Sequence, residues 1–383
     1  MSRDLRRLLR RPDDPDAYPT EPSDEEIAAR AGIARDEVVR FDLNTLGGGP
    51  LPAIAAAHAA WDLRRAVEYG DQQYRGLRER LGELAGVDAA RIAIGAGADE
   101  LIRLVTRLSA GDGDTVVIPT PTFGMFAVEA GLAGARVAAV ERRDPHRRQA
   151  VSDILEAARA GAARLTWLCS PNNPTGDAYP LDEIAHLAAE LEGMLVVDEA
   201  YLEFAAATLD APVTALTAIG LQDDHPNLLV LRSMAKAYGL AGARIGYLVS
   251  PSWLGERMNV ERLPLPVGSH TEALALAALE DTDAAEARHR LIVGERARMA
   301  EALSAFGWDV VASVTNFLLA RPPGGLATVV ASGLLSRGLV VRDYPPDSLL
   351  ASWLRITARA PRENARLLGA VRELAVDEGL AGA

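Results

Sequence analysis

The stretch NLLVLRSMAKAYGLAGARIGY, residues 227–247, holds the features that decide the fold. It opens with an apolar run at 227–233 that is typical of a buried strand. A loop rich in small residues follows and carries Lys236, the only lysine among the 40 basic residues. Arginine matches lysine in charge but stays protonated, whereas a lysine amine can lose its proton and attack an aldehyde. Taken alone, Lys236 is more simply a lysine left on a solvated surface, so its meaning depends on its neighbours.

Upstream of this stretch, helical patterns alternate with short apolar runs. This rhythm predicts an α/β fold in which a mostly parallel sheet is covered by helices on both faces, forming a large domain at 51–268. The expected strands lie at 91–94, 115–119, 135–140, 164–170, 194–200 and 227–233. The expected helices lie at 52–66, 74–86, from Asp99, 124–133, 152–160 and 181–192.

The two ends of the chain differ from this middle part. Ser23 and Glu26 form a capping box for a short helix in an N-terminal arm at 1–50. After the proline-rich segment at 263–269, a smaller C-terminal α/β domain is expected at 269–383. Its predicted elements are one long helix at 271–305, strands at 315–320, 338–342 and 353–357, and helices at 326–335 and 361–375.

Composition excludes several classes of protein. The formal charge of -13 disfavours binding to nucleic acid or an anionic membrane. No apolar run of about 18 residues predicts a membrane span, and the basic start at 1–15 leads into prolines and aspartates instead of a signal sequence. A cytoplasmic protein is therefore expected. A single cysteine, Cys169, and six histidines without ligand spacing predict neither a disulfide nor a metal site.

Four motifs follow strands of the large domain, where ligands bind in open parallel sheets. They are GAGADE at 95–100, SPNNPTG at 170–176, DEAY at 198–201 and RSMAKAYGLAGARIGY at 232–247. With these motifs in this order, the chain resembles the pyridoxal-phosphate-dependent aminotransferases of fold type I. It is most similar to their histidinol-phosphate aminotransferase branch. The resemblance covers the chain from about residue 24 and implies a seven-stranded sheet, a pyridoxal 5'-phosphate cofactor and a homodimer.

The resemblance assigns Lys236 as the Schiff-base lysine and proton shuttle, and Ser233 and Arg244 as ligands of the cofactor phosphate. GAGADE opens a helix, so the backbone N–H groups near Ala98 and Asp99 should point at an anion. Two other interpretations of GAGADE remain, a tight turn and a dinucleotide fingerprint. The fingerprint lacks its third glycine.

A carboxylate at the end of an apolar strand, such as Asp198, needs a cation. The resemblance supplies one in the protonated pyridine nitrogen, although Asp198 also suits a helix N-cap. Tyr201 and Asn173 match residues that hydrogen-bond the phenolic oxygen of the cofactor. The alternative for Asn173 is a plain turn.

Two aromatic residues match further family positions. Phe123 corresponds to the ring that stacks on the cofactor, and a core phenylalanine is the alternative. Tyr69 corresponds to a tyrosine that reaches the cofactor phosphate of the neighbouring subunit, so a complete site would need a dimer.

Three residues match family positions that bind the substrate. Arg355, between apolar neighbours in LRIT, matches the arginine that binds the substrate carboxylate. Arg342 lies at the spacing of a second anion-binding arginine, although an ion pair with Asp343 on the surface is an equal alternative. Asn44, in DLNTLGGGP at 42–50, matches the end of the arm.

The chain departs from the branch at several positions. Gly48 replaces an aromatic residue that would grip a distal phosphate, Ala235 replaces a hydroxyl residue, and ARAP at 358–361 replaces a frequent VG pair. These changes spare the cofactor residues and alter the substrate side. They argue against histidinol phosphate as the substrate.

The sequence therefore predicts an aminotransferase that moves an amino group between an amino acid, or an amino-alcohol phosphate-like substrate, and a 2-oxo acid. An amino-acid lyase, decarboxylase or cyclase on the same scaffold is the second hypothesis. A non-catalytic sensor module would need a DNA-binding domain, for which the short acidic arm leaves little room. A nicotinamide-dependent dehydrogenase is the remaining alternative.

Overall fold

The computed structural model describes residues 21–377. The basic segment at 1–15, with the rest of the first 20 residues, and the last six residues lie outside the described part. Within it, none of the helices combines the length and the apolar character that crossing a bilayer requires.

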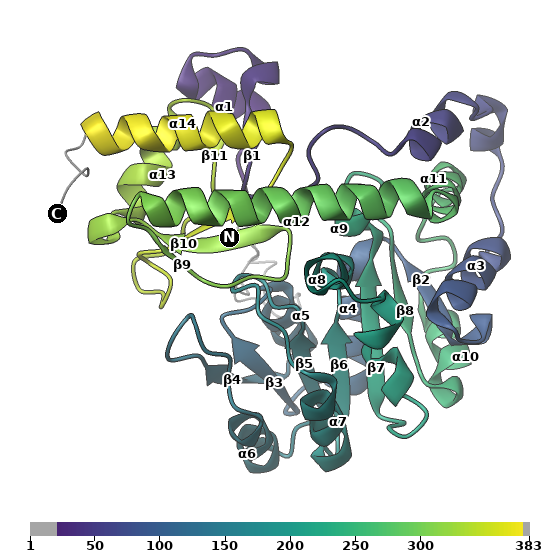
Figure 1. The fold of residues 1–383 in the computed structure, drawn as a ribbon. Coiled ribbons are helices and arrows are strands. Elements are labelled where there is room, and N and C mark those ends of the chain that lie inside the picture. Colours follow the sequence, from purple (N-terminus) through teal and green to yellow (C-terminus); the bar gives the residue numbers. More distant parts are fainter. Residues whose placement is uncertain (1–20, 378–383) are drawn as a thin grey trace, which may run out of the picture.

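A seven-stranded sheet organises the large part of the molecule (Figure 1). Its order is β2-β8-β7-β6-β5-β3-β4, and only β8 runs against the others. The mostly parallel sheet is thus confirmed, although β8 was not among the expected strands. The strands are β2 (Ile92–Gly95), β3 (Thr115–Thr120), β4 (Arg136–Glu141), β5 (Leu165–Cys169), β6 (Met194–Asp198), β7 (Leu228–Ser233) and β8 (Gly246–Val249).

Both faces of this sheet are buried along its inner strands, as their apolar sequences predict, whereas edge strand β4 is partly exposed. Successive residues of β6 alternate between two cores: Leu195 and Val197 belong to one and Val196 to the other. Packing on both faces explains why the strands read as continuous apolar runs instead of alternating ones. The helices of this part are α2 (Pro52–Ala59), α3 (Arg75–Ala85), α4 (Gly97–Ser109), α5 (Met125–Ala133), α6 (Val151–Gly161), α7 (Leu181–Glu190), α8 (Leu202–Leu209), α9 (Met234–Ala237), α10 (Ser252–Glu261) and α11 (Ser269–Glu280).

The arm and the C-terminal part pack together around a further core. The capping box at Ser23 and Glu26 is present and starts α1 (Asp24–Ala31). Arm strand β1 (Val39–Arg40) pairs in parallel with β11 (Leu339–Val340), so the arm is part of this unit. The other elements are β9 (Asp309–Val310), β10 (Phe317–Arg321) and β12 (Leu354–Thr357) in one antiparallel sheet, with α12 (Thr282–Ala305), α13 (Ala327–Leu335) and α14 (Pro361–Asp377).

The helix predicted at 271–305 is in fact two helices. Asp281, with φ -103° and ψ 54°, interrupts it between α11 and α12. The expected helix at 52–66 is also shorter, because α2 ends at Ala59. Helices α8, α9 and α10 were missed, and the segment of α9, which carries Lys236, was expected to be a loop. Short 3-10 turns connect several elements: η2 (Arg35–Glu37), η3 (Leu63–Val67), η4 (Ala89–Arg91), η5 (Val213–Ala215), η6 (Ala218–Leu221) and η7 (Pro323–Gly325).

Helix α12 runs from the large sheet domain across to the C-terminal unit (Figure 1). Ala285, near its start, packs in a core of the large domain. Ile292, Met299 and Leu303, further along, pack in the C-terminal core. One rigid element therefore contributes to both cores.

Candidate active site

The predicted motifs meet where parallel strands end. Asp198 is the last residue of β6, Lys236 lies in α9 directly after β7, and Asn173 follows β5. The arm segment at 42–44 and Arg355 of β12 approach the same place, as the contacts below establish. The sheet thus brings together residues that are far apart in sequence.

Lys236 sits on a short helix whose start is capped by Ser233. The Ser233 hydroxyl accepts a hydrogen bond from the backbone N–H of Ala235 at 3.2 Å. The Lys236 amine, Nζ, donates to the carbonyl of Leu43 in the arm at 2.9 Å. Burial, helped by the charges of Arg355 and Arg244, lowers the pKa of Lys236 to about 8. Since a pKa of 8 leaves about a tenth of the amine neutral at pH 7, a nucleophilic fraction is available.

Asp198 is only 3% exposed. Its Oδ1 accepts a hydrogen bond from the backbone N–H of Ala200 at 3.0 Å. Burial raises the pKa of Asp198 to about 7, and the negative charges of Asp99 and Glu199 add to this, while Lys236 opposes it. A carboxylate so poorly solvated is a strong partner for a cation brought into the site. The environment of Asp198 therefore fits a protonated ring nitrogen.

The predicted phosphate site lies at the start of α4. Gly97 has φ +79°, and a Cβ there would lie 2.7 Å from Nη2 of Arg244. A Cβ on Gly246 would lie 2.7 Å from the backbone nitrogen of Ala98. These two glycines let β8 and Arg244 approach the helix N-terminus, whose N–H groups favour an anion. The site therefore fits a phosphate.

Arg244 already has a partner in this site. Its Nη2 donates to Oδ2 of Asp99 at 2.6 Å, and both side chains are about half exposed. The side chain of Asp99 therefore takes part in the site, although only its backbone N–H was expected to do so. Asp99 fixes the guanidinium of Arg244 beside the helix N-terminus.

Arg355 connects three segments of the site. Its Nη1 donates to Oδ1 of Asn173 at 2.6 Å, and its Nη2 donates to the carbonyl oxygen of Asp42. Its Nε is buried and has no hydrogen-bond partner among the described residues. The guanidinium carbon lies 5.6 Å from the ring centroid of Phe317. The guanidinium of Arg355 is therefore held by two hydrogen bonds, while its Nε donor is left unsatisfied among the described residues.

Tyr201 and Asn44 form a second junction between sheet and arm. The Tyr201 hydroxyl accepts a hydrogen bond from Nδ2 of Asn44 at 3.0 Å. Burial raises the pKa of Tyr201, so its hydroxyl keeps its proton and can donate it to an acceptor. Asn44 is held in turn by Thr357, whose Oγ1 accepts from the Asn44 N–H at 3.1 Å and donates to its Oδ1 at 3.2 Å. Thr357 was not among the predicted residues.

The other three predicted site residues are Phe123, Tyr69 and Arg342, and their surroundings differ. Phe123 is half-buried and makes an edge contact with Phe126, with ring centroids 5.8 Å apart. Tyr69 is 89% exposed, so in a single chain it lies on the surface. Arg342 forms an ion pair with Glu21, a partner that differs from the Asp343 considered above.

No cluster of three or more His, Cys, Asp or Glu side chains with metal-binding geometry occurs in residues 21–377. Cys169 ends β5 beside Asp198 in the strand register. Burial raises the pKa of its thiol, which keeps it a neutral packing residue.

Comparisons with known proteins show the family and the fold of the chain. A family model described as aminotransferase class I and II matches residues 36–373. The histidinol-phosphate aminotransferase of Roseiflexus castenholzii is 35% identical to this chain, with 92% of the chain and 93% of the relative covered. The enzyme of that name from Xanthomonas campestris pv. campestris is 39% identical, with 79% and 84% covered.

Among solved structures, the histidinol-phosphate aminotransferase of Sinorhizobium meliloti in complex with pyridoxal-5'-phosphate has a similar fold. It superposes with a TM-score of 0.83 at 28% identity, covering 94% of this chain and 95% of that one.

Proposed function

The chain belongs to the class I and II aminotransferases, and on this premise we propose that it moves an amino group between an amino acid and a 2-oxo acid, with pyridoxal 5'-phosphate bound at Lys236. One observation carries the proposal. The only lysine of the chain has a lowered pKa and lies near Asp198, a buried carboxylate whose own pKa is raised. Such opposite shifts are typical of a catalytic pair.

The residues present fit the cofactor at three points. Asp198 would pair with the ring nitrogen, Tyr201 and Asn173 would donate to the phenolic oxygen, and the start of α4 would hold the phosphate. Ser233 and Arg244 complete the phosphate site. When bound, the cofactor supplies an aldehyde for bonding to an amine and a ring that withdraws electrons from the substrate's α-carbon.

The protein's own residues then position the substrate and move a proton. The guanidinium of Arg355 would bind the substrate carboxylate, which fixes the α-carbon against the cofactor ring. Nζ of Lys236, released as a neutral amine, would take the α-proton and return it to the cofactor side. Phe123 would pack on the ring.

Arg355→Lys tests the substrate role. Lysine keeps the charge but loses the planar fork, so we expect kcat/KM for the amino donor to fall by about 10²-fold, mainly through KM. Steady-state kinetics measure the effect, and the visible absorption of the bound cofactor should stay. Arg321→Lys is the matched control, because Arg321 is an exposed arginine of β10 paired with Asp309. Equal losses in both variants would contradict the assignment.

We also propose that the enzyme is a homodimer in which Tyr69 reaches the partner's cofactor phosphate. Its 89% exposure in the single chain supports this role. Tyr69→Ala and Lys236→Ala chains should each be nearly inactive alone. After mixing and subunit exchange, each mixed dimer holds one site with both residues intact, so activity should reappear at up to about half of the native value per mixed dimer. Absence of recovery, with exchange verified by mass, would contradict a shared site.

Half-reactions with single donors test the proposed function itself. An aminotransferase converts its bound cofactor to the amine form with one amino acid and no acceptor. A panel of amino acids, with and without distal phosphate, scored by absorption spectroscopy, should contain such donors. Release of ammonia or carbon dioxide without this conversion would favour the lyase or decarboxylase instead. The domain boundary at 51 and the cytoplasmic location remain part of this proposal. The boundary at 269 conflicts with the packing, because Ala275, Ala278 and Leu279 of α11 lie in a core of the large domain, which places the division nearer the break at Asp281.

A further inference from the structure

Two arginines of the C-terminal unit lie side by side. The backbone N–H of Arg342 donates to the carbonyl of Arg355 at 3.1 Å, and the N–H of Arg355 donates back at 2.9 Å. This reciprocal antiparallel pairing puts the two side chains on the same face. Because Arg355 contacts Asn173 and the carbonyl of Asp42 on that face, Arg342 lies beside the same residues of the candidate site.

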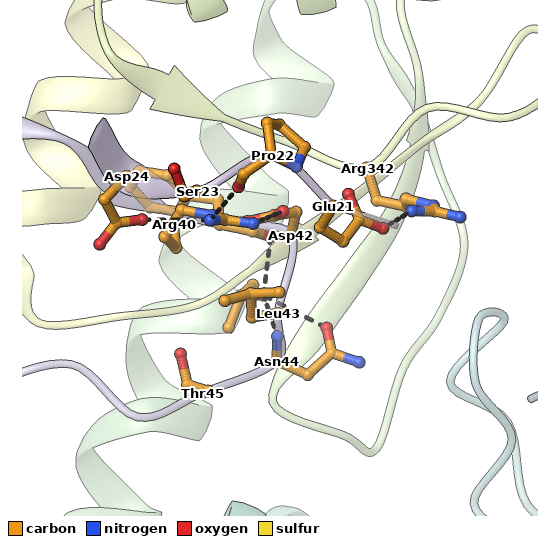
Figure 2. Close-up of polar contacts among 12 residues, drawn as sticks. Glu21, Pro22, Ser23, Asp24, Arg40, Asp42, Leu43, Asn44, Thr45 and Arg342 are labelled. Atoms are coloured by element: carbon orange, nitrogen blue, oxygen red, sulfur yellow. Dashed lines mark hydrogen bonds and ion pairs between the residues drawn. The ribbon is translucent and has the colours of Figure 1, made fainter. Parts of the chain in front are cut away.

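A carboxylate of the arm occupies Arg342. Oε1 of Glu21 contacts Nη1 of Arg342, and Figure 2 shows the two side chains meeting beside the segment Asp42–Asn44. Both side chains are largely shielded, with 31% and 25% of their surfaces exposed. Solvent screens a shielded ion pair less than a surface pair. The attraction between Glu21 and Arg342 is therefore stronger than that of a fully exposed ion pair.

The arm around Glu21 is fixed by a second arginine. Arg40 grips Asp42 with two bonds, of 2.9 Å from Nε and 2.7 Å from Nη2. Its Nη1 donates to the carbonyl of Pro22 at 3.0 Å and to Asp24 at 3.1 Å (Figure 2). Asp42 in turn accepts from Arg355 through its carbonyl. Residues 22–24 are therefore held next to Asp42 and Arg355. This position of the neighbouring residues places Glu21 beside Arg342.

The charge of Arg342 bears on which substrate side chains can bind beside Arg355. With Glu21 in place, Arg342 is neutralised, and a substrate with a second anion must displace the carboxylate before it can bind there. The arm continues as Gly47, Gly48 and Gly49, which contribute no side chain to hold such a group. Of this pair of arginines, Arg355 is then the one whose described contacts are with an amide oxygen and a backbone carbonyl and not with a carboxylate.

We propose that Glu21 occupies the anion subsite at Arg342 and selects substrates whose side chains carry no distal phosphate or carboxylate. This inference rests on the proposed function, since it assumes that Arg355 binds the substrate carboxylate. It makes Glu21 a specificity-determining residue of the same site.

Two unreactive ligands test it by equilibrium binding to the protein loaded with pyridoxal 5'-phosphate. Glutarate carries carboxylates at both ends, and glutaramate replaces one of them by a neutral amide. In Glu21→Gln, the affinity for glutarate relative to glutaramate, measured by calorimetry, should rise about ten- to a hundredfold, the range for a hydrogen bond to a charged group. Glu25→Gln, which removes an exposed carboxylate of the same arm paired with Arg35, should change nothing.

A double variant identifies where the second anion binds. Adding Arg342→Gln to Glu21→Gln should abolish the gain. An unchanged ratio in Glu21→Gln, or a gain that survives the loss of Arg342, would overturn the proposal. Because these ligands only bind, the outcome does not depend on turnover. Failure of every amino donor in the half-reaction panel would instead count against the proposed function.

Discussion

Replacement of Lys236 by arginine is expected to abolish transamination while leaving the fold intact. Arginine preserves the positive charge but neither forms the covalent bond to an aldehyde nor acts as a base near neutral pH. We expect kcat to fall by roughly 10³-fold or more, since both nucleophilic and general-base catalysis are lost. The half-reaction measured by stopped-flow absorption gives the size of the loss, and circular dichroism confirms folding.

The unusual composition supplies a direct control for this prediction. Borohydride reduction of the loaded protein, followed by peptide mass mapping, should place the phosphopyridoxyl group on Lys236, the only lysine of the chain. The variant K236R/R290K restores one lysine at an exposed position paired with Glu286, and it should stay inactive. A native-like rate in either variant, or label confined to the α-amino group, would refute the role of Lys236.

Asp198→Asn should cause the second-largest loss. Asparagine is nearly isosteric with aspartate but cannot carry the charge that keeps a ring nitrogen protonated. We expect kcat to fall by roughly 10²- to 10³-fold, the range for loss of one preorganised electrostatic contact. Single-turnover kinetics with saturating donor measure this loss. Glu199→Gln is the informative comparison, because the neighbouring carboxylate pairs with Arg232 at 3.1 Å within the core instead of facing the site. Glu199→Gln should lower the melting temperature but leave the single-turnover rate nearly unchanged.

The cofactor-free protein offers a pH test of the same residue. The pKa of Asp198 is about 7 in the folded chain, against 3.8 as its ordinary value. The folded state therefore holds an extra proton between about pH 4 and 7, and the contribution of Asp198 to stability is lost as pH rises through this window. In thermal unfolding, the melting temperature of Asp198→Asn relative to that of the native protein should rise as the pH is raised from 5 to 8. A constant difference would mean that the carboxylate is not buried as described.

The sequence was sufficient for the sheet and for the residues at its strand ends. Lys236, Asp198 and Asn173 each follow an apolar run, and a parallel sheet necessarily brings such positions to one edge. Strand β8 escaped detection because its four residues GYLV end a loop of small residues, and its antiparallel direction depends on the rest of the sheet.

Side-chain contacts between segments that are far apart along the chain could not be predicted from the sequence. The pairs of Asp99 with Arg244 and Glu21 with Arg342 join residues 145 and 321 positions apart, and no local pattern marks either of them. The hydrogen bond between Asn44 and Tyr201 is of the same kind. Tyr69 differs again, because its predicted contact lies in another subunit, so its role stays a prediction.

The break at Asp281 marks the start of the long helix α12, whose near and far parts pack in different cores. A helix of 24 residues is a stiff rod about 36 Å long, since each residue adds about 1.5 Å. Its far half packs in the core of the C-terminal unit, to which the segments carrying Arg342 and Arg355 belong, while Ala285 near its start packs with the large domain. The rod is therefore a fixed spacer between the sheet that carries Asp198 and the unit that carries both guanidinium groups.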